Sequence, residues 1–256
     1  MATTTVDTQA LETKVKDMYR HVATDPHGDY HFELGRSLAE RLGYASEVLE
    51  RIPPAATESF AGVGYFFDLA DLQPGEAVLD LGSGSGMDAC FAALMVGWTG
   101  RVVGIDFSTD QLAKARRLAA NAGYSQVELL EGRIEDLPVE DETFDCVISN
   151  GVINLSPGKE RVFAEAARVL RPGGRLAIAD IVTQQQLNDG IVCNADLWAS
   201  CIGGAAQQDA YRAAIETTGL RVDEVRENPY EFISGQAREA SGKYGVKSIS
   251  LRATKR

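Results

Sequence analysis

The chain has 256 residues and a formal net charge of −12, from 37 acidic and 25 basic side chains. This excess of acid excludes a polyanionic partner such as nucleic acid, because nucleic-acid binders carry basic stripes that neutralise phosphates. No stretch approaches 18 uninterrupted apolar residues and no basic segment precedes an apolar one at the start, so we expect no membrane span and a cytoplasmic protein.

The first predicted element is an N-terminal helix. Apolar residues recur at helical spacing from Leu11 to Val22 and form one face. Tyr19 belongs to this face, where we expect it to pack against the core or to cover a site.

All three histidines lie between Arg20 and Phe32. His27 and His31 are four residues apart with acids nearby, a spacing that suits a metal site only within a helix. Pro26 disfavours such a helix, and so does the glycine that follows His27. We therefore predict no metal site and expect a loop at the mouth of a substrate site.

A second helical stretch over residues 37–49 is ended by two prolines. Residues 58–67 then bring two glycines and four aromatic side chains, and this loop either wraps a ligand or packs beneath a sheet. We predict that residues 1–71 form a helical cap with covering loops, and that residues 72–256 form the main domain.

The main domain alternates apolar strands with helical patterns, which predicts an α/β fold with helices on both faces of a mostly parallel, Rossmann-like sheet. Seven strands are predicted, at residues 77–81, 101–105, 126–130, 144–149, 175–179, 221–226 and 247–253. Helices are predicted at residues 87–96, 109–122, 159–170 and 208–218. Residues 186–206 resemble a lid-like insertion, with a helix over 188–204 that contains Cys193.

The strongest local signal is a glycine turn after the first strand, with the pattern Asp80-x-Gly82-x-Gly84-x-Gly86. Glycines let a ligand lie against bare backbone. Asp106, at the tip of the second strand, is placed to accept hydrogen bonds from two ribose hydroxyls. A dinucleotide-binding turn is the alternative, but it is wider, and Asp80 repels a pyrophosphate while suiting an ammonium group.

The segment 77–106, together with Leu-Arg-Pro-Gly-Gly-Arg-Leu at residues 170–176, resembles class I S-adenosylmethionine (SAM)-dependent methyltransferases. The resemblance implies SAM as cofactor, an antiparallel last strand and Tyr19 over the bound SAM. The cofactor-binding residues that it implies are Asp80, Gly82, Ser83, Gly84, Gly86, Asp106, Phe107, Gln111, Ile134, Glu135 and Asn150.

Within that class, three segments are similar to the bacterial arsenite methyltransferase group: Gly-Arg-Ile-Glu-Asp-Leu-Pro at 132–138, Ile-Ser-Asn-Gly-Val-Ile-Asn-Leu-Ser-Pro at 148–157 and Leu-Trp-Ala-Ser-Cys-Ile-Gly-Gly-Ala at 197–205. Those enzymes hold As(III) through cysteine thiolates and transfer the SAM methyl group to it. The acceptor-side residues that the resemblance implies are Gly151, Asn154, Trp198 and Cys201.

The chain departs from that group in its cysteines. Gly151 stands where the group has a cysteine, the loop at 62–64 has none, and Cys201 alone matches an arsenic-binding position. On a continuous helix Cys193 and Cys201 would lie about 12 Å apart. They would then be unable to share one arsenic atom, which prefers several thiolates.

We therefore predict a SAM-dependent methyltransferase that acts on a small molecule, as a monomer or a homodimer. The acceptor is a soft nucleophile such as arsenite or a thiol, or else an oxygen, nitrogen or carbon atom of a metabolite. The candidate catalytic residues are Asn150 and Tyr19, with His27 or His31 as a base for a harder acceptor. The alternative is a regulatory module that binds SAM without methyl transfer.

Overall fold

A computed structural model of the chain describes residues 6–194, 197–198 and 202–256. Seven of its strands form one path in the order β3-β2-β1-β4-β5-β8-β7, and two-residue β6 pairs with β5. The strands are β1 (Ala77–Leu81), β2 (Arg101–Asp106), β3 (Val127–Glu131), β4 (Phe144–Asn150), β5 (Leu170–Thr183), β6 (Ala206–Gln207), β7 (Leu220–Glu227) and β8 (Lys247–Lys255). β8 runs antiparallel between β5 and β7, whereas β3, β2, β1, β4 and β5 are parallel. The predicted Rossmann-like sheet with an antiparallel last strand is confirmed.

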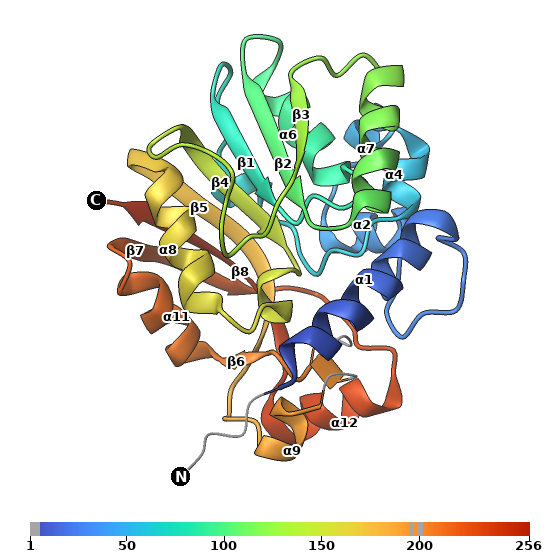
Figure 1. Cartoon of the computed structure of the whole chain (residues 1–256), viewed down its shortest axis with the longest axis vertical. Helices are drawn as coiled ribbons and strands as arrows, with labels where there is room; N and C mark the ends of the chain where they lie inside the picture. The colour runs from blue at the N-terminus through green and yellow to red at the C-terminus, as the bar shows by residue number, and fades with distance from the viewer. Residues whose placement is uncertain (1–5, 195–196, 199–201) are drawn as a thin grey trace.

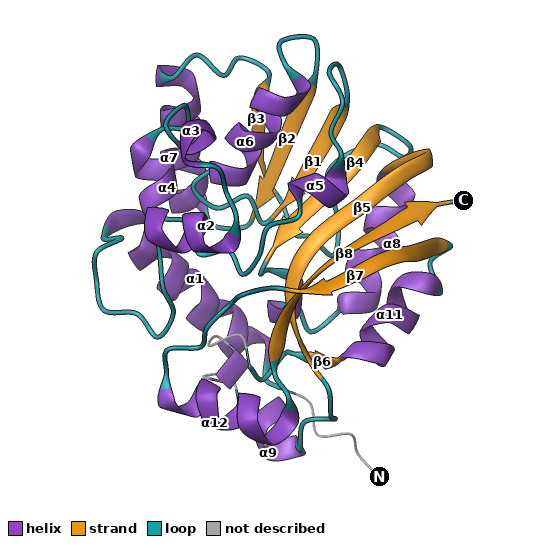
Figure 2. Ribbon diagram, turned by 180° about the vertical axis from the view of Figure 1, so that it is seen from behind, coloured by secondary structure: helices purple, strands orange, loops and turns teal. Residues whose placement is uncertain are grey.

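Helices cover both faces of the sheet and leave a hydrophobic cluster on each. Figure 1 shows α8 (Lys159–Val169) and α11 (Gln208–Glu216) on one face, and Figure 2 shows α2 (Arg36–Leu42) and α5 (Phe67–Ala70) on the other. The remaining helices are α1 (Thr8–Thr24), α3 (Ser46–Leu49), α4 (Pro54–Glu58), α6 (Met87–Val96), α7 (Thr109–Asn121), α9 (Asp189–Val192) and α12 (Gly235–Tyr244), with a 3-10 turn η1 (Ile153–Leu155). No helix among these described residues is long and apolar enough to cross a membrane.

The structure differs from the predicted elements in places that have local causes. The helix expected over 37–49 is divided into α2 and α3, because Gly43 adopts a left-handed conformation (φ +114°) that ends α2. Helix α12 was not predicted, since two glycines and a weak apolar pattern give it little helical signal. β5 is longer than expected at both ends, because it pairs along β4 and β8.

The continuous lid helix expected over 188–204 is wrong, because the helix that begins there is short, although Leu197 and Trp198 are again helical. Helix α9 has four residues and ends at Val192, so that Cys193 follows it as the capping residue. Cys201 lies outside the described residues. The separation of about 12 Å expected between the two thiols on a continuous helix therefore does not apply.

Helix α1 crosses the carboxyl ends of the parallel strands and is tied to α7 (Figure 1). Asp7 accepts hydrogen bonds from two backbone amides in the first turn and begins the helix. At the other end, Gln111 Nε2 donates to the Tyr19 carbonyl oxygen (2.7 Å) and Lys114 Nζ donates to that of Ala23 (2.9 Å). These contacts hold α1 above the glycine turn.

A buried arginine fixes the loop before β1 to the adjacent sheet. Arg175 is 8% exposed, and its guanidinium donates to both carboxylate oxygens of Glu76, at 2.9 and 2.6 Å. It also donates to the backbone oxygens of Ala70 and Asp71. The ion pair thus connects β5 with the entry into β1, the strand that leads to the glycine turn.

We expect Glu76→Ala to lower the free energy of unfolding by about 3 kcal/mol, because it leaves a buried guanidinium without its partner charge. Glu128→Ala is the matched control: both side chains of the Arg101–Glu128 pair are 49% exposed, and such pairs contribute about 0–1 kcal/mol. Urea unfolding followed by circular dichroism measures both. Equal losses in the two variants would contradict this assignment.

Candidate functional site

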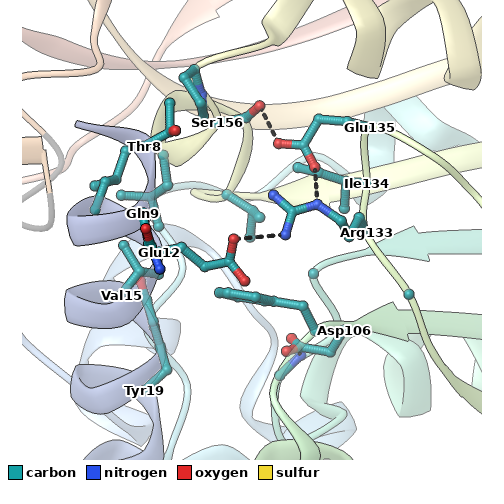
Figure 3. Close-up of a pocket in the computed structure, with 18 residues that line it drawn as sticks. Thr8, Gln9, Glu12, Val15, Tyr19, Asp106, Arg133, Ile134, Glu135 and Ser156 are labelled. Atoms are coloured by element: carbon teal, nitrogen blue, oxygen red, sulfur yellow. Dashed lines mark hydrogen bonds and ion pairs between the residues drawn. The ribbon is translucent and has the colours of Figure 1, made fainter. Parts of the chain in front are cut away.

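A cavity of about 300 Å³ lies between α1 and the carboxyl ends of β1 and β2 (Figure 3). Its lining comes from three regions of the chain that the fold brings together. These residues are Thr8, Gln9, Leu11, Glu12, Val15 and Tyr19 of α1; Gly82, Gly84, Asp106 and Phe107 after β1 and β2; and Gly132, Arg133, Ile134, Glu135, Val152, Leu155, Ser156 and Pro157 after β3 and β4.

A second cavity of about 70 Å³ adjoins the first, and the two have Tyr19, Gly82, Gly84 and Val152 in common. The other residues that line it are Ala56, Ser59, Phe60, Ala61, Gly62, Asp80, Ser83, Ser85, Met87, Asp88, Gln111 and Asn150. Both cavities therefore border the glycine turn.

Asp80 is the penultimate residue of β1, lines the smaller cavity and is 2% exposed. Within the described part of the chain its Oδ2 atom has no hydrogen-bond partner. Burial, and then the carboxylates of Asp88 and Asp106, raise the pKa of Asp80 well above its usual range. A buried carboxylate oxygen without a partner at a cavity wall is suited to a cation. The residues present therefore fit the ammonium group of SAM, as the sequence indicates.

The glycine turn exposes bare backbone to the cavities. Gly82 and Gly84 both have positive φ (+73° and +52°), as does Gly86 at the start of α6. A Cβ on Gly82 would lie 2.5 Å from Val152, whereas the nearest atom to one on Gly84 is Gln111 Oε1 at 3.9 Å. A side chain at 84 would thus project into space that a ligand needs.

Asp106 holds the glycine turn and also lines the larger cavity. Its Oδ2 accepts from the amide of Gly84 (2.9 Å) and its Oδ1 from that of Ser108 (2.8 Å). Burial raises its pKa, while these backbone amides oppose the rise. Because each carboxylate oxygen accepts two hydrogen bonds, both retain capacity toward the cavity. Asp106 can thus accept hydrogen bonds from a ligand in the larger cavity, and its contact with a ribose stays a prediction.

Part of the wall of the larger cavity is apolar. Phe107 and Ile134 line it, and Glu135 is held in place by Ser156 Oγ, which donates to Glu135 Oε1 at 2.6 Å. Figure 3 shows an ion pair between Arg133 and Glu12 of α1 (2.8 Å) within this lining.

Ser83 and Gln111, two further predicted cofactor-binding residues, line the smaller cavity, but their side chains differ in whether the protein supplies hydrogen-bond partners. Ser83 Oγ has no hydrogen-bond partner among the described residues. Gln111, by contrast, accepts from Ser85 Oγ (2.5 Å) and donates to the Tyr19 carbonyl. Gln111 thus holds α1 in place, and Tyr19 faces both cavities.

The amide of Asn150 is saturated by protein partners. Its Oδ1 accepts from the amides of Val63 (2.7 Å) and Gly64 (3.3 Å). Its Nδ2 donates to Tyr44 Oη, to Asp88 Oδ2 and to the Gly64 carbonyl, at 3.0–3.1 Å. Asn150 lines the smaller cavity as part of its wall, and the long-range partners that fix it carried no signal in the sequence.

Neither cavity is lined by the two candidate histidines or by the described acceptor-side residues Gly151, Asn154 and Trp198. His27 is exposed and His31 is half-buried against the edge of Phe32, with ring centroids 4.7 Å apart. No group of residues that could hold a metal ion occurs in the described ranges. Asn154 is fully buried and donates to the Gly151 carbonyl (3.0 Å).

Trp198 is buried beside α1 and has a packing role. It belongs to a hydrophobic cluster with Leu155 and Val15, and Lys159 Nζ lies 4.7 Å from its ring centroid. Its indole also donates to the Val192 carbonyl at 2.5 Å. Trp198 therefore supports the helix that roofs the cavity.

Asp88 is a cavity residue that sequence reasoning missed. It stands alone as an acid in the otherwise apolar helix α6, where eight of ten residues are buried. A single acid within a continuously apolar helix is a signal for a buried, partnered carboxylate.

The site combines a glycine turn after the first strand of an open, mostly parallel sheet with two buried acids. One acid lies in that first strand and the other at the tip of the next strand. This combination defines a nucleoside-binding site of the Rossmann-like kind. The family model described as "Methyltransferase domain" matches residues 72–219, and the chain belongs to that family, as a class I SAM-dependent methyltransferase domain.

Named relatives agree with this class. The chain is 38% identical over 229 residues to an arsenite methyltransferase of Halobacterium salinarum, covering 88% of this chain and 58% of that protein. It is 40% identical over 137 residues to the arsenite methyltransferase of Homo sapiens, covering 50% of this chain and 36% of that protein. It therefore spans less than two thirds of the length of these relatives.

A solved structure is also similar. It is an arsenic (III) S-adenosylmethionine methyltransferase from Chlamydomonas reinhardtii, 33% identical, with a TM-score of 0.66 over 86% of this chain and 73% of that one.

We expect Asp106→Ala to weaken SAM binding by about ten- to a hundredfold, because hydrogen bonds to a charged group contribute about 1.5–3 kcal/mol. Asp110→Ala is the matched control, since it removes an exposed acid nearby that lines neither cavity. Calorimetric titration with SAM measures both. An unchanged affinity in Asp106→Ala would remove this residue from the site.

Gly84→Val is expected to abolish SAM binding while the protein stays folded. The left-handed conformation costs a non-glycine residue about 1–2 kcal/mol, and the new side chain enters the ligand's space. Gly123→Val shares the strain (φ +79°) with nothing within 4 Å of its Cβ. Thermal unfolding should show similar losses in both, whereas normal SAM binding by Gly84→Val would show that the turn is misplaced.

Proposed function

We propose that this protein transfers the methyl group of SAM to a small-molecule acceptor. The observation that carries the proposal is the buried, unpartnered Oδ2 of Asp80 at the cavity wall. Asp80 would hold the ammonium group of SAM and Asp106 its ribose, while Phe107 and Ile134 would enclose the adenine. SAM supplies an electrophilic methyl group on a sulfonium centre.

The chain's own contribution to the reaction is alignment and exclusion of water. Helix α1 roofs both cavities through Tyr19, and Gln111 and Lys114 hold it there. Since His27 and His31 line neither cavity, the geometry favours an acceptor that needs no general base. A soft nucleophile, such as a thiol, meets that condition.

The cysteines do not support an As(III) site like that of the bacterial arsenite methyltransferase group. Cys90 and Cys146 are buried, and burial raises the pKa of each thiol to about 12. Gly151 has φ +72°, and a Cβ there would lie 3.1 Å from Val63. Among the described residues only Cys193 is a partly exposed thiol. We infer that a three-thiolate As(III) site is absent from this part of the chain.

The alternative function is a regulatory module that binds SAM without methyl transfer. Asp80, Asp106 and the glycine turn serve either function equally. Formation of S-adenosylhomocysteine in a screen of arsenite with glutathione, simple thiols, selenite, phenols and amines separates the two. Tight SAM binding without product from any of these acceptors would favour the module.

We expect the purified protein to methylate arsenite slowly or not at all, because one matched thiol holds As(III) weakly. Cys201→Ser should leave SAM affinity unchanged. Arsenite-dependent formation of S-adenosylhomocysteine is measured for the unaltered protein, for Gly151→Cys and for Gly151→Ala, which shares the backbone strain without the thiol.

Activity that appears only with Gly151→Cys would support the missing-ligand interpretation. Robust turnover by the unaltered protein that disappears in Cys201→Ser would instead overturn it and restore arsenite as the acceptor.

A further inference from the structure

The structure contains two buried networks of the same composition, each with one aspartate, one tyrosine and one asparagine. In the first, Asp88 of α6 accepts from Tyr44 Oη at 2.7 Å and from Asn150 Nδ2 at 3.0 Å. The Asn150 amide also donates to Tyr44 Oη at 3.1 Å, which closes a triangle. All three side chains come from different elements.

The second network lies on the opposite face of the sheet. Asp180 of β5 accepts from Tyr211 Oη of α11 and from Asn154 Nδ2, both at 2.6 Å. Burial raises the pKa of Asp180, as it does that of Asp88. Because no member of this network lines either cavity, it provides an internal comparison for the first.

The first network differs in what it holds. Asp88 and Asn150 both line the smaller cavity beside Asp80. Through its other hydrogen bonds Asn150 fixes the backbone of Val63 and Gly64, and a Cβ on Gly62 would lie 2.5 Å from Asn150 Nδ2. The loop before the core is thus pressed against the end of β4, at the cavity wall.

We propose that Asp88 is a positioning residue of the SAM site. It orients Asn150 and Tyr44 so that loop 62–64 closes the methionine end of the cavity, and its carboxylate adds a second negative charge beside Asp80 for a cationic ligand. This inference rests on the proposed function, because it takes SAM as the ligand of the cavity.

The charges around Asp88 determine how binding depends on pH. Asp80 faces it from β1, and Tyr44 and Tyr65 face it from the preceding loops, while Asp106 of β2 acts on Asp80 in turn. Burial raises the pKa of Asp88 to about 6, against the lowering by its bonds from Tyr44 and Asn150. A bound cation favours the ionised carboxylate. The contribution of Asp88 to SAM affinity is therefore full well above pH 6 and is lost as the pH drops through 6, by at most about tenfold per pH unit for one proton.

The experiment is calorimetric titration of the full chain with SAM between pH 5 and 8, for the unaltered protein and matched pairs of variants. Asp88→Asn removes the charge, and we expect SAM binding at pH 7.5 to weaken by about tenfold or more, with a flatter pH profile. Tyr44→Phe removes a bond that lowers the pKa of Asp88, so the midpoint of the profile should move to higher pH.

The controls are Asp180→Asn and Tyr211→Phe, the same changes in the second network. We expect them to lower the thermal unfolding temperature as the first pair does, yet to keep the affinity and pH profile of the unaltered protein. Asp80 remains in every variant, so the differences between proteins, and not the profile of the unaltered protein, report on Asp88.

Three outcomes decide the matter. If Asp88→Asn keeps the SAM affinity and Tyr44→Phe keeps the midpoint of the pH profile, this inference is overturned while the proposed function stands. Equal changes in Asp180→Asn and Tyr211→Phe would have the same consequence. Should Asp88→Asn not fold, the midpoint of Tyr44→Phe decides in the same way. Failure of the unaltered protein to bind SAM would remove the proposed function and this inference with it.

Discussion

The site depends on one electrostatic constraint, the buried carboxylate of Asp80 at the end of β1. Burying a charge without a partner is costly, and proteins keep such a group only where the surrounding structure fixes it. Here β2 and β4 pair with β1 on both sides, and Asp80 lies opposite Gly104 and Ile148 in those strands. The sheet therefore holds the carboxylate in place. A cationic ligand that binds only the folded state raises the free energy of unfolding of the protein.

Much of the fold was predictable because its signals are local. Buried parallel strands are continuous apolar runs, and β1 and α6 begin and end at the predicted residues. The glycine turn and Asp106 were likewise identifiable, since a tight turn with bare backbone limits which residues occur there. Elements with weaker local signals, such as α12 and the division between α2 and α3, were missed or merged.

The rest of the site was not predictable because it depends on contacts between distant residues. Asn150 bonds to Tyr44 and Gly64, which precede it by 106 and 86 residues, and no periodicity in the sequence encodes such pairs. The histidines show the converse. The spacing of His27 and His31 invites a functional interpretation, yet neither residue lines a cavity. Sequence spacing indicates chemistry only where the intervening backbone is regular.

The turn after β4 connects the two buried networks and contains the position at which the chain departs from the arsenite methyltransferase group. Asn150 at its start belongs to one network and Asn154 to the other, and between them Gly151 takes a left-handed conformation with its amide bonded to the Ala179 carbonyl. A cysteine at 151 would strain that conformation and press on Val63. The departure from the arsenite methyltransferase group at this position therefore involves the conformation of the turn as well as the missing thiol.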